Sequence, residues 1–458
     1  MASLEKLLQM VDESENELVQ LLCDLIRFPT VNTGARSVPT GDELPLVEFL
    51  QDKLSAEGIA SEIWKSAERR ANLVARLAGR SGAPRLLYMA HTDVVPVEDE
   101  SVWTYPPFSA TVADGRVWGR GAADMKDMLA AEAMALILLK RAGVALQGDL
   151  IYAAGADEET GGKYGFGWLA ENAPEAIRAD CGLNEGGGGV ITTDKGPVYA
   201  VSVGEKGRLE VHITVRGKAT HASTPWAGDN PAFKLAEILE RLAAYQPEID
   251  VSQEIFSALP TLLGRAEPIT VENVDAVADQ VSAVNVHLGY ALRGLSRMTL
   301  VPTMISGGIK SNSVPTTCKL VCDVRTLPHQ DEAYVKSQVE GILAGIEGAS
   351  YELVYTAVPS ASPFNTDFAA AVRRATEVAT GRQDLLWLPS LTTGFTDSRL
   401  VRPLGVTIYG FGPSHPDSDP NFPSGVHGAN ENTEISGLLL MTKMFVALAC
   451  DVLQAQVD

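Results

Sequence analysis

Features that mark membrane and secreted proteins are missing from this sequence. No stretch of the 458 residues reaches the run of about eighteen apolar residues that a membrane-spanning helix needs. The N-terminus, MASLEKLLQMVDESENELVQ, has acidic residues and amphipathic spacing, but it lacks the basic start and apolar centre of a signal peptide. We therefore expect neither a membrane span nor an export signal.

Cysteines are few, and their spacing forms no CxxC pair. The sequence has five of them, an odd number, at Cys23, Cys181, Cys318, Cys322 and Cys450. A disulfide framework or a cysteine zinc site would need paired spacing. Cys318 and Cys322 lie four residues apart on one face of a predicted strand, and we interpret them as buried free thiols. This use of cysteine predicts a reducing compartment, the cytoplasm.

Basic residues are scarce relative to acidic ones. The chain has 37 Lys and Arg against 58 Asp and Glu, which gives a formal net charge of −21. Because nucleic acids and anionic membranes repel such a chain, we expect it to bind neither. The global charge says little about a small substrate, since a local site can oppose it. Internal repeats and low-complexity tracts are also missing, and the length is enough for two domains with a large core.

Apolar strand-like segments alternate with amphipathic helical segments in the first 198 residues. The predicted strands cover residues 72–79, 85–91, 149–156 and 180–186, and the predicted helices cover 4–27, 44–58 and 127–143. This alternation predicts an α/β domain whose mixed, mostly parallel sheet is sandwiched by helices.

The pattern changes at about residue 199. The segment 207–217 alternates strictly, with Leu209, Val211 and Ile213 on one face, which predicts a strand with one wet face. The elements that follow are a helix at 230–245, strands at 298–308 and 316–328, a helix at 331–346 and a strand at 351–358. Their β-α-β-β-α-β order predicts a ferredoxin-like α+β domain inserted into the first. We therefore predict a catalytic domain in two parts, 1–198 and 359–458, with the insertion at 199–358.

Histidines and carboxylates stand where the predicted strands of the first domain end. They are His91 and Asp93 in AHTD, Asp124 in GRGAAD, the DEE run at 157–159, Glu185 in NEGG and His427 in HGANE. Ligands of open α/β sheets bind at the edge beyond the carboxyl ends of the strands. We therefore expect these side chains to share one site.

The residue types of this group favour a metal site. Imidazole nitrogen and carboxylate oxygen both bind Zn²⁺, and cations make a crowd of carboxylates tolerable. Two ions roughly 3.5–4 Å apart can activate a water molecule and stabilise an oxyanion. His91 and Asp93 share a face of an extended segment, so Asp93 is predicted to hold the His91 ring from behind. Taken singly, each residue also fits an ordinary loop or capping role, and Asp124 in particular could cap the helix after it.

The ordered motifs HTD, GRGAxDxK, DEExGG, NEG, HASTP and HGANE resemble those of a family of two-metal peptidases and deacylases. That family includes acetylornithine deacetylase, succinyl-diaminopimelate desuccinylase, aminoacylase and glutamate carboxypeptidase. The resemblance runs from about residue 15 to the C-terminus. It implies two divalent ions, zinc with manganese or cobalt as alternatives, and a lid domain through which two chains form a homodimer.

The resemblance also assigns the metal ligands. It implies that His91, Asp124 and Glu185 hold one ion and that Asp124, Glu159 and His427 hold the other, with Asp124 bridging the two.

The same resemblance assigns the base. Glu158 takes a proton from the water between the ions and passes it to the leaving nitrogen. A cis peptide bond between Asp124 and Met125 is implied as well.

The lid residues are assigned in the same way. His221 resembles the histidine that crosses a dimer interface to stabilise the oxyanion, and Asn312 and Arg325 resemble residues that bind the substrate, Arg325 through its carboxylate. Gly394 resembles the glycine of a substrate-side loop. Simpler alternatives stay open: His221 could cap a turn, Asn312 could serve its own loop, and Arg325 could pair with Asp323.

The chain departs from the family pattern at three places. Lys126 is usually followed by glycine but here by Asp127, NSVP replaces the more usual NVIP, and Phe395 stands where a small residue is common. Asp127 adds an acid near the cluster and is expected to tighten or reshape its turn, and the other two changes touch the presumed substrate pocket. Glutamate rather than aspartate at 185 resembles the deacylase and carboxypeptidase branches.

These observations predict a metal-dependent hydrolase that cleaves the amide bond of an N-acyl amino acid or small peptide with a free carboxylate. Two alternatives remain: a deaminase-type hydrolase acting on another C–N bond, and a relative that binds metal without catalysis.

Overall fold

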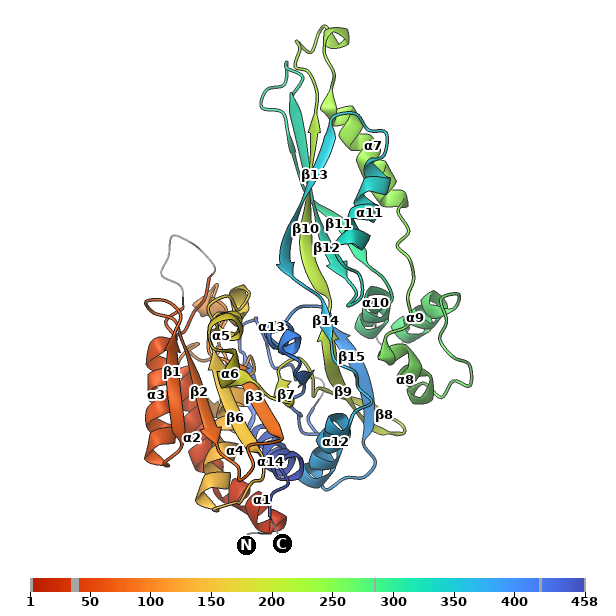
Figure 1. Cartoon of the computed structure of the whole chain (residues 1–458). Helices are drawn as coiled ribbons and strands as arrows, with labels where there is room; N and C mark the ends of the chain where they lie inside the picture. Colours follow the sequence, from red (N-terminus) through yellow and green to blue (C-terminus); the bar gives the residue numbers. More distant parts are fainter. Residues whose placement is uncertain (1–2, 34–40, 284–285, 420–421, 457–458) are drawn as a thin grey trace. The chain divides into compact units, whose positions relative to one another are not determined.

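The computed structural model describes residues 3–33, 41–283, 286–419 and 422–456. The chain forms two compact units, shown in Figure 1. The first comprises Met1–Val203, Ser362–Ser390 and Thr396–Asp458, and the second comprises Gly204–Ala361 and Leu391–Phe395.

The limits of the second unit differ from the predicted insertion, 199–358. The unit begins at Gly204 and also takes in Leu391–Phe395, which the prediction assigned to the catalytic domain. Strand β9 (Gly196–Glu205) runs without a break from the first unit into the second, so the strand pattern carries no mark of the boundary.

Ten of the described strands form one sheet in the order β1-β2-β6-β3-β7-β16-β9-β14, and β8 and β15 also pair with β9. The strands other than β9 are β1 (Ala60–Lys65), β2 (Ala71–Leu77), β3 (Arg85–His91), β6 (Asp149–Gly155), β7 (Cys181–Asn184), β8 (Val190–Thr193), β14 (Ser360–Ala361), β15 (Leu386–Thr392) and β16 (Thr407–Gly410). The central strands β6, β3, β7 and β16 pair in parallel, and the strands β1, β2 and β9 beside them pair antiparallel. The predicted mixed sheet is confirmed, but it is not mostly parallel as predicted, because β1, β2, β8, β9 and β14 pair antiparallel around the parallel centre.

Helices cover both faces of the sheet in the first unit. They are α1 (Leu4–Glu13), α2 (Glu15–Ile26), α3 (Leu44–Ala56), α4 (Lys126–Arg141), α5 (Phe166–Asn172), α6 (Pro174–Ile177), α12 (Asp367–Thr380), α13 (Ser398–Val401) and α14 (Ile435–Val452). Tyr88 and Tyr152 point to one face, where their hydroxyls donate to carbonyl oxygens of α14 and α4. Leu87, Met89 and Ile151 point to the other face and pack with residues of α5, α6 and α13. The alternation of side chains along β3 and β6 thus fills two cores.

Helix α14 is long and apolar enough to cross a membrane by length and composition alone. However, 67 % of its apolar window is buried inside the chain, where it packs on α4 and α12. The buried core helix of a globular protein passes the same test, so this helix is weak evidence for a membrane span.

The single helix predicted at 4–27 is two helices, α1 and α2, because the chain turns at Ser14. Ser14 has φ −97° and ψ 10°, outside the helical region, and is the last cap residue of α1 and the first of α2. Serine favours helix ends over helix interiors. The stretch contains neither glycine nor proline, so the apolar pattern alone did not reveal the break.

The second unit contains a four-stranded sheet in the order β11-β12-β10-β13. Its strands are β10 (Gly207–Arg216), β11 (Thr299–Gly307), β12 (Thr317–Thr326) and β13 (Ala349–Ala357), and helices α7 (Pro231–Ala244) and α11 (Glu332–Leu343) pack on one face. The chain order of these elements is the predicted β-α-β-β-α-β. Three helices that the prediction missed, α8 (Glu254–Leu262), α9 (Val274–Ser282) and α10 (Val286–Leu295), lie between α7 and β11 in the chain.

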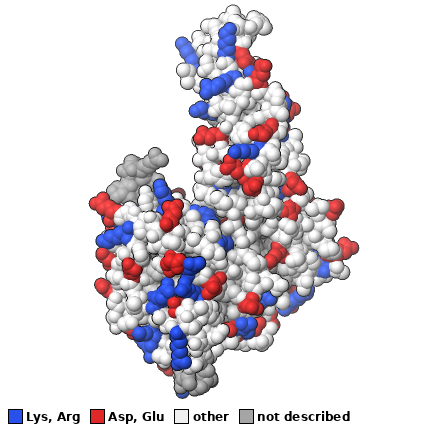
Figure 2. Space-filling model, in the orientation of Figure 1, with Lys and Arg blue, Asp and Glu red and all other residues white. Residues whose placement is uncertain are grey.

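The excess of acidic residues is not concentrated in one region of the face drawn in Figure 2, where acidic and basic side chains lie interspersed. Several of these charged side chains form ion pairs. Arg141, for example, forms ion pairs with Glu17 at 2.7 Å and with Glu57 at 2.6 Å. Because such pairs are solvent-exposed, each contributes little to stability, and the functional charges have to be sought among buried groups.

Candidate metal centre

The parallel centre of the sheet brings the predicted ligands to one edge. Strands β6, β3 and β7 run side by side, with His91 opposite Gly155 and Tyr88 opposite Leu183. His91 is the last residue of β3, Glu185 directly follows β7, and the DEE run comes just after β6. Since the carboxyl ends of parallel strands meet at one edge, these side chains converge there.

Asp124 lies between two histidines. Its Oδ1 is 3.0 Å from His91 Nε2, and its Oδ2 is 3.0 Å from His427 Nε2. Glu185 Oε2 lies 3.7 Å from the same nitrogen of His91, and Glu159 Oε2 lies 3.3 Å from that of His427. The five side chains thus form two groups that share Asp124, each on a different oxygen. These are the two ligand groups that the sequence predicts.

Two other sets of possible ligand atoms overlap the two groups that share Asp124. Ligand atoms of His91, Asp124 and Glu159 all lie within 4.8 Å of one another, and so do those of His91, Glu158 and Glu185. Glu158 therefore borders the same cluster as Glu159. We assign Glu159 as the ligand because its carboxylate contacts His427, and the predicted base Glu158 then lies beside the His91 group.

The charges of the cluster favour the binding of a cation. Although burial lowers it, the carboxylates of Glu185 and Asp124 raise the pKa of His91 well above its usual value. Hydrogen bonds to Asp124 and Glu159 raise the pKa of His427 to about 10. Burial raises the pKa of Glu185 to about 7 despite its His91 partner, and burial together with Glu185 raises that of Glu158 well above its usual value. Without another cation, the cluster therefore retains protons.

The residues present fit a pair of divalent ions. Protons that a metal-free cluster retains are the ones that metal binding displaces. Glu159 Oε1 is buried and has no hydrogen-bond partner in the part of the chain that the structure describes. A buried oxygen in that state is costly unless a cation or donor meets it. His91, Asp124 and Glu185 would hold one ion, and Asp124, Glu159 and His427 the other.

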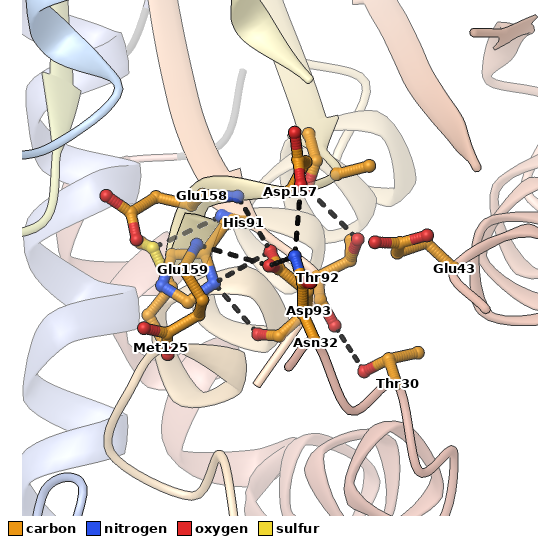
Figure 3. Close-up of polar contacts among 12 residues, drawn as sticks. Thr30, Asn32, Glu43, His91, Thr92, Asp93, Met125, Asp157, Glu158 and Glu159 are labelled. Carbon is orange, nitrogen blue, oxygen red and sulfur yellow. Dashed lines mark hydrogen bonds and ion pairs between the residues drawn. The ribbon is translucent and has the colours of Figure 1, made fainter. Parts of the chain in front are cut away.

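Asp93 lies behind the His91 ring, where it was predicted, and its carboxylate has a further role. The ring Nδ1 lies 2.9 Å from the Asp93 main-chain carbonyl and 3.6 Å from its carboxylate. The carboxylate accepts hydrogen bonds from the main-chain N–H groups of Glu158 (3.0 Å) and Glu159 (3.2 Å), as Figure 3 shows. Asp93 therefore fixes both the ring and the turn that carries the two glutamates.

Asp157, whose role the sequence left open, holds this turn. Its backbone is left-handed, with φ at 69°, a conformation that aspartate tolerates better than most residues. Its carboxylate accepts hydrogen bonds from Arg70 (2.6 Å), Asn32 (3.1 Å) and the Tyr164 N–H (3.0 Å). The first of the three acids is thus a structural anchor.

Several residues that support the site were not predicted. Asn32 also donates to Asp93 at 2.9 Å, and Arg70 also contacts the buried Glu43 at 3.2 Å. Single polar residues outside the motifs carry no local signal, since only the fold brings them to the cluster. Figure 3 shows Asn32 between Asp93 and Asp157.

Glu431 is the last residue of the HGANE motif, and the sequence predicted no role for it. One of its oxygens accepts the N–H groups of Ala123 and Asp124, both at 3.0 Å, and the other pairs with Arg120 at 2.6 Å. Glu431 and Arg120 are both buried. The pair ties the loop that carries His427 to the loop that carries Asp124. The cis peptide predicted between Asp124 and Met125 is confirmed.

The predicted lid residues form two pairs at opposite ends of the sheet in the second unit. His221 forms an isolated bridge with Ser313, and the Ala222 N–H donates to the carbonyl of Asn312, beyond the Arg216 end of β10. Arg325 pairs in register with Arg208 at the other end, where it donates to the carbonyl of Thr393, beside Gly394.

The simpler alternatives for two lid residues also hold. Arg325 pairs with Asp323 at 2.8 Å, and His221 Nδ1 lies 2.6 Å from the hydroxyl of Ser223 within its own turn. The substrate roles of His221, Asn312, Arg325 and Gly394 stay predictions.

Comparison with known proteins places these features in a family. Residues 87–451 match the model of peptidase family M20/M25/M40. A probable succinyl-diaminopimelate desuccinylase of Staphylococcus aureus strain MRSA252 is 31% identical over 348 residues, which cover 74% of this chain and 75% of the relative.

Solved structures share the fold. An M20 family metallo-carboxypeptidase from Sulfolobus solfataricus matches with a TM-score of 0.69 at 20% identity, covering 94% of this chain and 98% of its own. A Bacillus subtilis protein described as a dinuclear metal-binding peptidase of the M20 family matches with a TM-score of 0.59 at 15% identity, covering 97% and 99%.

Proposed function

The chain belongs to peptidase family M20/M25/M40, and we propose that it hydrolyses the amide bond of N-acyl amino acids or small peptides with a free carboxylate. The observation that carries the proposal is the Asp124 carboxylate, whose two oxygens each face one histidine and whose neighbours are the acids Glu159 and Glu185. The names of the relatives, a desuccinylase and peptidases, describe the cleavage of bonds of this kind.

Each residue of the site has a task in this reaction. Divalent ions, when bound, supply a Lewis acid for the substrate carbonyl and lower the pKa of a nearby water. Glu158 accepts a proton from the attacking water at its carboxylate and delivers it to the leaving nitrogen. Asp93 holds the Glu158 amide at 3.0 Å, which aims the base. His221 donates a hydrogen bond to the developing oxyanion.

We propose two ions per chain, with zinc as the metal and manganese or cobalt as alternatives. Nitrogen and oxygen ligands without sulfur accept several divalent ions, and zinc binds well to mixed histidine and carboxylate sites. The Bacillus subtilis relative named as dinuclear supports the number.

Removal of the metal is expected to lower thermal stability. A chelator would leave the buried carboxylates without cations, so the thermal midpoint should fall, by the equivalent of about 3–4 kcal/mol for each ion whose free concentration is 100 to 1,000 times its dissociation constant. Differential scanning calorimetry before and after chelation, and after return of zinc, measures this. An unchanged midpoint after chelation has removed the metal, or the absence of bound metal from the untreated protein, would count against the metal assignment.

Substrate specificity is tested with paired compounds. A panel of N-acyl amino acids and dipeptides is offered to the metal-replete protein, each compound with a free carboxylate and as its carboxamide. Release of the amino acid from the free carboxylates alone is the expected result. Release of ammonia from a compound without an acyl group would instead favour the deaminase-type alternative. No turnover at all, with metal bound, would favour a non-catalytic role.

We further propose that the protein is a homodimer joined through the second unit. Eight residues of β10 separate the His221 end of the sheet from the Arg325 end, about 27 Å at roughly 3.4 Å per residue. A dipeptide spans at most about 7 Å. His221 and Arg325 of the same second unit therefore cannot both touch one substrate, and a second copy has to supply one of them.

Strand β11 offers the surface for this pairing. It is the edge of its sheet, and Val301, Met304 and Ile305 are 51 to 66% exposed. Exposed apolar edge strands are surfaces on which another strand pairs. Pairing of β11 with its copy would extend the sheet across two chains.

Complementation tests the dimer. Chains with Glu158→Gln and chains with His221→Ala are co-expressed under different tags, and the mixed dimer is isolated. If His221 acts on the partner's site, the mixed dimer contains one intact site and one that lacks both residues, so about half of the wild-type activity returns. A mixed dimer as inactive as each variant alone would show that His221 does not act across the interface.

We also propose the cytoplasm as the working compartment. All five cysteines are buried free thiols, as expected for a protein of a reducing compartment.

A further inference from the structure

A cavity in the first unit opens directly beside the metal centre. It has a volume of about 370 Å³, and its wall includes Asp124 and Glu185. Its lining is otherwise mostly apolar or glycine, with Met125, Met128 and Met441 as its large side chains. A second lobe of about 360 Å³ shares Asp127, Met441 and several glycines with the first and continues away from the centre. The cavity is large enough for an acyl chain, and thioether side chains adapt to chains of varied shape.

Asp127 is the polar residue of the cavity wall that is not among the proposed metal ligands. It is 7% exposed. One of its oxygens accepts the Met128 N–H at 2.8 Å, and the other accepts the Thr433 hydroxyl at 3.2 Å. Neither partner is a cation.

No other charge on the wall neutralises Asp127. Among the described residues that line the inner lobe there is no lysine, arginine or histidine. Arg116 and His415 line only the outer lobe, where Arg116 pairs with Glu434 and donates to Asn432 at 2.7 Å. Burial, with Glu431 and Asp124 as nearby acids, raises the pKa of Asp127 to about 7. A carboxylate placed against Asp127 would therefore meet a second buried acid, whereas a cationic or hydrogen-bond-donating group would find an acceptor and favour the charged form of Asp127.

We propose that this cavity binds the acyl part of the substrate and that Asp127 selects acyl chains ending in an ammonium or another hydrogen-bond donor over chains ending in a carboxylate. The inference rests on the proposed amide hydrolysis. The acyl part is chosen because binding of the amino-acid carboxylate needs a basic side chain, and none lines the inner lobe among the described residues. The chain thereby differs from what the desuccinylase name of its relatives would suggest, since a succinyl group ends in a carboxylate.

Asp127 also has a structural role, and the test must separate that role from the selection of the acyl chain. It lies in the first turn of α4, where an acid interacts favourably with the helix dipole. The Asp127→Asn variant keeps the side-chain oxygen that accepts the Met128 N–H, and its amide can donate to the Thr433 hydroxyl. It therefore removes the charge while retaining the shape. Asp194, an exposed acid in the turn between β8 and β9, supplies the matched control Asp194→Asn.

The test uses three acyl-alanines that differ only at the chain end: 6-aminohexanoyl-, hexanoyl- and adipoyl-alanine. For the wild-type protein, kcat/KM should fall in that order, with about 100-fold between the first and the last. In Asp127→Asn that ratio should shrink about tenfold or more. Asp194→Asn should keep the wild-type ratio. Equal selectivity in the wild type and Asp127→Asn would overturn the inference, and thermal midpoints of both variants identify a merely structural effect.

A binding measurement decides the inference even if no acyl-alanine is cleaved, an outcome that would count against the proposed function instead. Calorimetric titration of the metal-replete protein with 6-aminohexanoate, hexanoate and adipate should give affinities in that order, and Asp127→Asn should lose the preference for 6-aminohexanoate over adipate. Tighter binding of adipate by the wild type would contradict the role of Asp127.

Discussion

Replacing Glu158 by glutamine is expected to lower kcat by about 10²–10⁴-fold, the contribution of a positioned general base. Glutamine has the same shape but cannot accept the proton, and the main-chain N–H that Asp93 holds stays in place. Metal content should stay at the wild-type level because Glu158 is not assigned as a ligand. Initial rates with an N-acyl amino acid, and elemental analysis of the same preparation, measure both.

The adjacent Glu159 is the matched control. Its carboxylate lies 3.3 Å from His427, so Glu159→Gln should lose the ion on the His427 side as well as activity. Comparison of the two variants thus distinguishes the general base from the metal ligand. Wild-type turnover in metal-replete Glu158→Gln, or loss of metal from it, would show that the roles of the two glutamates are wrongly divided.

Replacing Asp124 by asparagine is expected to have the broadest effect, the loss of both ions and with them of hydrolysis. An asparagine side chain offers one oxygen where the carboxylate offers two, and both of these face histidines at 3.0 Å. The loss in kcat should be at least as large as the about 10²–10⁴-fold expected for Glu158→Gln.

Glu185→Gln provides the contrast to Asp124→Asn. Because Glu185 contacts only the His91 group, that variant should keep the ion on the His427 side. Metal counts per chain for the two variants decide the point. Equal counts in Asp124→Asn and Glu185→Gln would contradict a bridging Asp124.

Three of the proposed metal ligands could be predicted because they lie at or just beyond the end of a strand with a clear apolar pattern. Parallel strands end at one edge, so strand order and residue type were enough to gather His91, Glu159 and Glu185. The ordered motifs added Asp124 and His427, whose loops have no such pattern of their own. The alternating strand 207–217 also predicted the one-sided sheet of the second unit, since its burial alternates residue by residue.

The supporting contacts could not be predicted, because they depend on tertiary structure. Arg70 and Asn32 come from separate segments and meet Asp157 only in the folded chain. Asp93 contacts His91 as expected, but the hydrogen bonds that its carboxylate accepts from the Glu158 and Glu159 amides have no signal in the sequence. The prediction missed helices α8 to α10 because they are short and because no strand-like segment marks where they begin. The cavity beside Asp127 depends on loops from three parts of the chain.

Hydrolysis measured as a function of metal occupancy tests the central claim most directly. The metal-free chain is titrated with zinc while bound metal and the release of an amino acid from an N-acyl amino acid are followed together. The account predicts no turnover without metal and saturation of activity at two ions per chain. Full turnover by the metal-free chain, or saturation with fewer than two ions bound, would contradict it.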